Sequence, residues 1–310
     1  MAAIVDLVTV ADLDRGASNC AVPTSVGAWR ERINTRLAEL IHPDEHTCCQ
    51  LDKAMRFSLL SPGKRVRPLL SILCALDFDH DPRPLLDFGC ALEMVHCASL
   101  MLDDLPCMDD ARMRRGQPAA HIEYGEATAT LAAVALLNHA FAVIASSRTL
   151  PERIRCQLVT CLSQAVGTSG LVSGQSRDLI ERQAGLDSGC LERINQQKTG
   201  ALFELAVVGG GMVADLPRDR LDILSQYAGH VGQAFQIADD LLDCCEHGKN
   251  SGKDCGADVD KAGSVHQVGE AALQARLACE LSGANREIKR LGLDRSLMRE
   301  FVRSLFQRLI

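Results

Sequence analysis

Residues 85–110 read LLDFGCALEMVHCASLMLDDLPCMDD, an apolar run about five helical turns long that closes on four aspartates. A second run, residues 218–243, ends in FQIADDLLD and so carries Asp239, Asp240 and Asp243. Residues 85–102 are apolar almost all round, which is typical of a helix at the centre of a bundle. The two runs predict an all-α fold in which two long helices carry clusters of carboxylates at their ends.

These carboxylate clusters indicate the chemistry. Carboxylates crowded at the end of an apolar segment repel one another and resist burial unless cations neutralise them. Mg²⁺ prefers oxygen ligands, and it commonly uses one or two protein carboxylates and leaves its other positions to water and substrate phosphate. Asp239 and Asp243 share a helical face, whereas Asp103 and Asp109 are separated by Pro106, so we expect the first helix to loosen there. Two facing clusters would form a cage for a diphosphate.

Length and composition favour one helical domain. The 310 residues suffice for a substantial core, and no linker indicates a domain boundary. Aromatic residues make up only 4%, and Val, Ile and Thr nowhere cluster at a period of two, which argues against strands. The net charge of −7 argues against a nucleic-acid-binding surface. We expect residues 25–310 to form a single all-α domain.

Cysteine usage and the N-terminal segment bear on the compartment. The 14 cysteines are scattered, with neither a CxxC framework nor His residues at zinc spacing. So many isolated thiols favour a reducing compartment, and we expect a cytoplasmic protein. Residues 1–24 contain Asp6, Asp12 and Asp14 and no basic start, so we interpret them as a flexible arm and not as a signal peptide.

Residues 127–147 contain no charged side chain and are long enough to span a bilayer. They include Thr128, Thr130, Asn138 and His139, and no aromatic belt accompanies them. We therefore interpret the segment as a helix buried at the centre of the bundle and not as a membrane span.

The remaining helices follow from periodicity. Ser25 is the predicted N-cap of a helix whose apolar positions recur at three and four residues, namely Val26, Trp29, Ile33, Leu37 and Ile41. Further helices are expected over residues 49–60, 69–76, 158–181, 201–213, 218–239, 267–281 and 296–309. Residues 244–263 are rich in Gly and Asp, carry Lys249, Lys253 and Lys261, and indicate a flap over the site.

Several cations and one histidine have two interpretations. Lys64-Arg65-Val66-Arg67 follows a break at Pro62-Gly63; alone it would be a solvated loop, but opposite two acidic clusters it would bind a second anionic group. His96 lies two turns before Asp103 on a similar face and would look into the same cavity, although a lone His on an apolar helix is more often a core residue. Taken alone, Lys198 and the pair Gln175 and Asp178 have an ordinary surface interpretation.

Seven motifs occur in order along the chain. They are GKRxRP (63–68), DDLPCMDD (103–110), RRG (114–116), GQxxDL (174–179), KTG (198–200), FQxxDDxLD (235–243) and GKD (252–254). From Trp29 to Ile310 the chain resembles the trans-isoprenyl diphosphate synthases, specifically the bacterial geranylgeranyl and farnesyl diphosphate synthases. The resemblance implies an all-α bundle around a deep apolar cavity, acting as a homodimer on isopentenyl diphosphate and allylic diphosphates.

The resemblance also implies roles for individual residues. The Mg²⁺ ligands, for three ions per site, would be Asp103, Asp109 and Asp239, supported by Asp104, Asp240 and Asp243. The allylic diphosphate would be held by Arg114, Lys198 and Lys253. Isopentenyl diphosphate would be held by Lys64, Arg67, His96 and Arg115. The polar residues beside the reacting carbons would be Thr199 and Gln236.

Product length in this family depends on the depth of the cavity beneath the first acidic motif. Ala98 and Ser99, about one turn upstream, are small where a bulky aromatic would block the growing chain. We therefore expect a twenty-carbon product, geranylgeranyl diphosphate, with farnesyl diphosphate as the alternative. Met94 and Val95, deeper on the same helix, are candidates for the floor.

Some alternatives remain open at the level of sequence. Pro62 stands where the family commonly has Gly, and Ala262-Gly263 follows Lys261 where Ser or Thr is usual, so the role of Lys261 stays open. A class I terpene cyclase or a head-to-head condensing synthase also uses two acidic motifs but lacks GKRxRP. A non-catalytic regulatory subunit of a prenyl synthase would typically have lost acidic residues, and both motifs are intact here.

Overall fold

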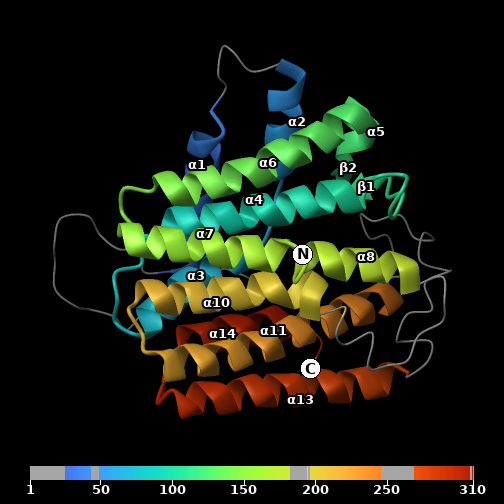
Figure 1. Ribbon diagram of the computed structural model, residues 1–310. Helices are drawn as coiled ribbons and strands as arrows, with labels where there is room; N and C mark the ends of the chain where they lie inside the picture. The colour runs from blue at the N-terminus through green and yellow to red at the C-terminus, as the bar shows by residue number, and fades with distance from the viewer. Residues whose placement is uncertain are drawn as a thin grey trace.

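Helix α4 (Leu85–Asp103) is the element around which the N-terminal half of the bundle is built. The computed structural model describes residues 25–42, 49–181, 194, 196–245, 269–307 and 309. Within this part of the chain α4 packs against α1 (Val26–Leu40), α2 (Cys49–Leu59), α3 (Val66–Asp77), α6 (Glu126–Ser146) and α10 (Ala201–Val213). Figure 1 shows α4 and α6 lying side by side across the molecule.

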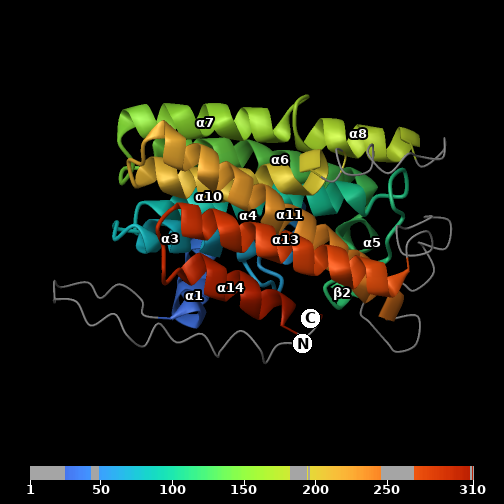
Figure 2. The ribbon, with the colours of Figure 1, turned by 90° about the horizontal axis from the view of Figure 1, so that it is seen from below.

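Helix α10 links this layer to the C-terminal half. It packs against α3, α4, α7 (Glu152–Val166) and α11 (Arg218–Cys245). Beyond it, α11 packs on α13 (Glu270–Arg290), and α14 (Leu297–Phe306) packs on α3 and α13. Figure 2 shows α14 and α13 on the face of the bundle opposite α7 and α8 (Leu171–Glu181). The prediction of an all-α fold is confirmed, and the described strands are limited to the short antiparallel pair β1 (Met113–Arg114) and β2 (Gln117–Pro118).

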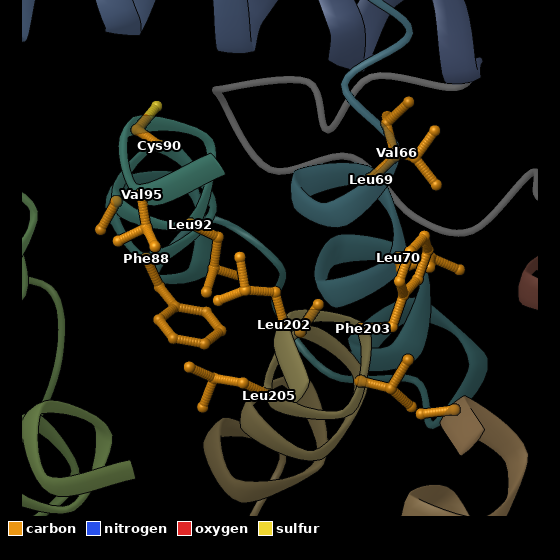
Figure 3. Packing of buried hydrophobic residues seen from close by; sticks show 14 of the residues in the cluster. Val66, Leu69, Leu70, Phe88, Cys90, Leu92, Val95, Leu202, Phe203 and Leu205 are labelled. Atoms are coloured by element: carbon orange, nitrogen blue, oxygen red, sulfur yellow. The ribbon is translucent and has the colours of Figure 1, made fainter. Parts of the chain in front are cut away.

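The core lies between α3, α4 and α10. Figure 3 shows Phe88 and Leu92 of α4 beside Leu202 and Leu205 of α10, with Leu70 of α3 on the other side. All five side chains are buried. Close packing of these three helices fixes the axis of α4, and with it the position of the aspartates at its end.

The first helix forms as its sequence predicts. The Ser25 hydroxyl accepts a hydrogen bond from the backbone N–H of Ala28 at 3.1 Å, which is the expected N-cap contact. The buried positions of α1 are Val26, Trp29, Ile33 and Leu37. Periodicity alone therefore identified both its start and its inner face.

The predicted helix over residues 158–181 is wrong as a single element. The chain forms α7 and α8 with a break between them, where the N–H of Gly167 bonds the carbonyl of Ser163. A Cβ added at Gly170 would lie 2.0 Å from the carbonyl oxygen of Ala165, a distance that no side chain tolerates. Gly167 and Gly170 thus let the backbone leave the first helix and begin a second one.

Helix α6 corrects the prediction of a centrally buried segment. In the described part of the chain α4 and α6 are both long and apolar enough to cross a membrane by length and composition alone. The apolar window of α4 is 67% buried, but that of α6 is only 39% buried. Leu131 and Val134 of α6 are 61% and 53% exposed. The alanine-rich face of α6 packs on α4, and its opposite apolar face is open.

Other boundaries shift modestly. Helix α11 continues to Cys245, past the predicted end at Asp239, and α4 ends at Asp103 instead of loosening beyond it. The predicted arm (1–24) and most of the predicted flap, including Lys249, Lys253 and Lys261, lie outside the described residues, as does the side chain of Asp243.

Candidate active site

A cavity of about 1010 Å³ opens at the end of the bundle where α4 and α11 finish. Its walls come from the loop before α3, the C-terminal parts of α4 and α11, the start of α8, and the turn that precedes α10. The predicted site residues that line it are Lys64, Arg67, His96, Ser99, Asp103, Asp109, Arg114, Arg115, Lys198, Thr199, Gln236 and Asp239. Segments from both halves of the chain thus meet in one space.

The first acidic stretch reaches the cavity because α4 stops. The N–H of Asp109 donates to the carbonyl of Asp103 at 2.9 Å, and Asp110 takes a left-handed conformation with φ of 48°. This compact turn sets Asp103 and Asp109 on the same wall. Burial raises the pKa of Asp103 to about 6, and the nearby charge of Asp109 adds to that rise while Lys198 opposes it.

The second acidic stretch is tied to the turn before α10. Thr199 Oγ1 donates to Gln236 Oε1 at 3.3 Å, and Gln236 Nε2 donates to Asp240 Oδ1 at 3.1 Å. Asp239 lies on the cavity wall, next in sequence to Asp240. The chain of contacts orients Gln236, so that its amide and the Thr199 hydroxyl face the cavity together.

The donor set fits Mg²⁺ held jointly by protein and substrate. Among the described residues, no three His, Cys, Asp or Glu side chains approach closely enough to form a complete metal site. Asp103, Asp109 and Asp239 nevertheless offer hard oxygen donors to one cavity, where burial raises the pKa of Asp103 to about 6. Partial coordination by carboxylates, completed by phosphate oxygens, is the ordinary mode for Mg²⁺.

Asp104 differs from its neighbour Asp103. It is buried and pairs with Arg114, whose Nε donates to Asp104 Oδ1 at 2.9 Å and whose Nη2 makes a second contact. Asp104 lines a small adjoining pocket and is absent from the wall of the large cavity. It therefore holds Arg114 in place, and its predicted role as a support for the Mg²⁺ ligands stays a prediction.

Lys198 lies in a π-helical turn, η2 (Gln196–Gly200), that leads into α10. Its Nζ lies 2.7 Å from Asp178 Oδ2 on α8. The two segments touch because position 174 is a glycine: a Cβ there would lie 2.5 Å from the backbone N of Lys198. The surface interpretation of Lys198 and Asp178 is wrong, since the pair fixes a cation on the cavity wall.

A cluster of cations forms another part of the cavity wall. Lys64, Arg67 and Arg115 lie there around His96. The guanidinium carbon of Arg67 lies 4.6 Å from the centre of the Phe203 ring, and burial lowers the pKa of Arg67 to about 10. Burial, and then the charges of Arg67 and Arg115, hold the pKa of His96 well below its usual value. A neutral imidazole among three cations suits a wall that receives an anion.

Three further polar residues line the cavity without having been predicted as site residues. Arg65 and Glu93 form an ion pair with 2.7 Å between Nη1 and Oε1, and both are buried. Gln175 faces the cavity, and neither end of its amide has a hydrogen-bond partner in the described part of the chain. The sequence carried signals for two of them: Glu93 is the one acid of residues 88–102, and Gln175 stands in the GQxxDL motif.

The two residues predicted to control chain length, Ala98 and Ser99, lie in different surroundings. Ser99 lines the cavity, whereas Ala98 is 2% exposed and packs in the core, as do Met94 and Val95. Adjacent residues on a helix point about 100° apart, so only one of the pair can face the same wall. The effect of each on product length stays a prediction.

Comparisons with known proteins agree with this geometry. The model of the polyprenyl synthetase family matches residues 49–271. The geranylgeranyl diphosphate synthase of Pantoea ananas is 39% identical over 280 residues, covering 89% of this chain and 91% of that protein. The farnesyl diphosphate synthase of Bacillus subtilis is 37% identical over 256 residues, covering 81% and 86%.

Solved structures share the fold. An FPP/GFPP synthase from Zymomonas mobilis superposes with a TM-score of 0.80 at 29% identity, covering 91% of this chain and 96% of that one. A geranyltransferase from Helicobacter pylori, complexed with magnesium and isoprenyl diphosphate, also has a TM-score of 0.80, at 26% identity, covering 92% and 96%.

Proposed function

This chain belongs to the polyprenyl synthetase family and is a trans-prenyltransferase, and we propose that it makes geranylgeranyl diphosphate from isopentenyl diphosphate and allylic diphosphates. One observation carries the proposal: residues of both acidic stretches and a cluster of cations line a single cavity. The acidic side suits a diphosphate bound through Mg²⁺, and the cationic side suits a second diphosphate bound directly. Two diphosphate substrates can therefore meet with their hydrocarbon parts between them.

The acidic side and the cationic side of the cavity each bind one of the two substrates. Bound Mg²⁺, for which we propose three ions held by Asp103, Asp109 and Asp239, would supply positive charge to the allylic diphosphate. Lys198 and Arg114 hold the same group from the protein side and stabilise the negative charge that grows as its C–O bond breaks. The diphosphate leaves with the bonding electron pair, and an allylic carbocation remains.

The second substrate is held by the cationic wall. Lys64, Arg67 and Arg115 bind the diphosphate of isopentenyl diphosphate, and neutral His96 donates a hydrogen bond to it. The double bond attacks the carbocation to form the new C–C bond. A proton is then lost from the neighbouring carbon to the departed diphosphate, which gives an allylic product longer by five carbons. The apolar walls keep water from the carbocation.

Support for a twenty-carbon product comes from two sources. Ser99 is a small side chain on the cavity wall, leaving room for the growing chain. The relatives include a geranylgeranyl diphosphate synthase from Pantoea ananas, although the similarly related protein of Bacillus subtilis is a farnesyl diphosphate synthase. Farnesyl diphosphate is therefore the second candidate product.

We also propose a homodimer that works in the cytoplasm. The exposed apolar face of α6, with Leu131 and Val134, supports association with a second copy, because covering such a face is favourable. The intact acidic stretches argue against a non-catalytic regulatory subunit.

The test is an elongation assay. Purified protein is incubated with Mg²⁺, isopentenyl diphosphate and, separately, dimethylallyl, geranyl or farnesyl diphosphate, and product length is measured by mass spectrometry; reactions with EDTA serve as controls. Accumulation of geranylgeranyl diphosphate supports the proposal. If only farnesyl diphosphate accumulates, the protein is still a trans-prenyltransferase, but its product is farnesyl diphosphate. No elongation with any primer would contradict the catalytic proposal.

A further inference from the structure

We propose that Arg65 and Glu93 are positioning residues for the isopentenyl diphosphate subsite: they fix the loop that carries Lys64 and Arg67 and do not themselves bind the substrate. This inference rests on the proposed function. It starts from a difference among the three cations of residues 64–67. Of these, Arg65 is buried and forms an ion pair with Glu93.

The Arg65 side chain is almost saturated with partners. Its Nε donates to Asn34 Oδ1 at 2.9 Å, and Nη1 donates to Glu93 Oε1 at 2.7 Å. Its Nη2 donates to two backbone carbonyls, those of Leu59 at 3.1 Å and Ser61 at 2.8 Å. Four of its five N–H groups are thus used, and the residue is 3% exposed. Arg65 has little capacity left for a substrate oxygen.

These partners belong to segments that must be held together for the subsite to exist. Asn34 lies on α1, Glu93 on α4, and the two carbonyls lie at the end of α2 and just after it. The loop from Ser61 to Arg65 therefore folds around its own guanidinium group. Arg65 also takes a left-handed backbone conformation, with φ of 51° and ψ of 42°, at the start of α3. The side-chain contacts stabilise a backbone that is otherwise unfavourable for a residue with a Cβ.

Glu93 also lies close to the guanidinium group of Arg115. Its Oε1 lies 3.9 Å from Arg115 Nη2, and Arg115 Nη1 lies 3.4 Å from Ser61 Oγ. Glu93 is only 2% exposed, so its charge depends on these cations. One buried carboxylate thereby links the loop before α3 to the turn between β1 and β2, and it spaces Arg65 and Arg115 apart.

Lysine cannot replace Arg65 in this arrangement. The guanidinium group is a flat fork that reaches a carboxylate, an amide and two carbonyls in different directions, whereas an ammonium group is a single point on a flexible stem. Arg65→Lys keeps the positive charge and removes the fork. We expect the loop to lose its fixed position and Lys64 and Arg67 to bind isopentenyl diphosphate less well.

The experiment compares both substrates in steady-state kinetics. Arg65→Lys is expected to raise the KM for isopentenyl diphosphate about tenfold, as for the loss of a hydrogen bond to a charged group. The KM for geranyl diphosphate should change by less than about twofold, because that substrate binds at the other wall. Calorimetric titration with isopentenyl diphosphate alone should show the same loss of affinity.

The matched control is Arg36→Lys. Arg36 Nε donates to Asp87 Oδ1 at 2.8 Å, so it joins α1 to α4 as Arg65 does, but it does not line the cavity. This control should leave both KM values unchanged. Equal rises in the two KM values for Arg65→Lys, or no change in either, would overturn the inference.

A second variant keeps the test decisive if Arg65→Lys folds poorly. Glu93→Gln retains the shape and removes the charge, and it should raise the KM for isopentenyl diphosphate selectively. The double variant should be no worse than about the worse single variant, since both act through one contact. Additive effects would contradict a shared role. Failure of the wild-type protein to elongate any primer would instead reject the proposed function.

Discussion

Asp77, at the end of α3, caps the first turn of α14, 220 positions further along the chain. Its carboxylate accepts hydrogen bonds from Ser296 Oγ and from the backbone N–H of Leu297, both at 2.6 Å. The N–H of Met298 also donates to it at 3.2 Å. A residue of one helix thus satisfies the free donors of another, and it closes the C-terminal end of the bundle against α3.

Asp77→Ala should lower the free energy of unfolding by about 2 kcal/mol at pH 7, because it removes this cap and leaves buried donors without partners. Urea denaturation would measure the change. As a control, Ser25→Ala removes an N-cap with a single described contact and should cost about 1 kcal/mol or less. An equal or larger loss at Ser25 would contradict the argument.

Asp77 should also make the free energy of unfolding depend on pH. Burial raises the pKa of Asp77 from 3.8 to about 6, although its hydrogen bonds oppose the rise. Between these values the folded state binds more protons than the unfolded state, so stability falls as the pH rises from about 4 to about 6. The loss amounts to at most about 3 kcal/mol.

Denaturation across this range should compare the wild type with Asp77→Asn, which cannot titrate. As the pH rises from about 4 to about 6, the free energy of unfolding of the wild type should fall relative to that of Asp77→Asn. A difference that is constant with pH would show that the carboxyl does not titrate in this range.

Gly174→Ala should damage the site by separating α8 from the π-helical turn. The added Cβ would lie 2.5 Å from the backbone N of Lys198, so Lys198 must move. We expect a cost of about 1–3 kcal/mol in stability and a raised KM for the allylic substrate. The control is Gly229→Ala in α11, where a Cβ meets no heavy atom within 4 Å and should add about 0.5–1 kcal/mol of stability.

Ser99→Phe should shorten the product. Ser99 lines the cavity, and its hydroxyl donates to the carbonyl of His96 in its own helix, so a phenyl ring can enter the space. We expect the main product to shift from twenty to fifteen carbons, measured by mass spectrometry, with Ser99→Ala unchanged. Ala98→Phe remains a second test of the chain-length prediction, but Ala98 is packed in the core and overpacking should cost about 1–3 kcal/mol.

Asp103→Asn should reduce kcat/KM by about a hundredfold or more, because an amide is a far weaker Mg²⁺ ligand than a carboxylate. The loss should be steepest at low Mg²⁺ concentration. Asp81→Asn is the matched control, since Asp81 pairs with Arg83 on an exposed loop. Similar losses in the two variants would indicate a general effect of charge and not a site at Asp103.

Sequence alone predicted the fold and about half of the residues that line the cavity. The 3.6-residue period of Val26, Trp29 and Ile33 reports burial directly, and the motifs around Asp103 and Asp239 report the site. The break at Gly170 was missed because glycine permits either close helix packing or a turn, and only the path of the backbone decides between them. The exposed face of α6 was missed because an apolar composition does not distinguish a buried helix from one whose outer face is open.

The direction of polar side chains was the least predictable property. Asp103 and Asp104 are neighbours, yet one faces the cavity and the other is sequestered by Arg114. Likewise Arg65 is indistinguishable by residue type from Arg67. These outcomes depend on contacts with α1 and α4 that no local pattern encodes.

The π-helical turn at Gln196–Gly200 determines the direction in which its side chains point relative to α10. Its hydrogen bonds span five residues where those of an α-helix span four, so the turn accommodates one residue more than regular α-helix would. Removing a single residue from it would restore α-helical geometry and rotate everything on its N-terminal side by about 100° relative to α10. Lys198 would then swing away from Asp178. The position of Lys198 on the cavity wall thus depends on the number of residues in this turn, and deleting one of them would move Lys198 off that wall.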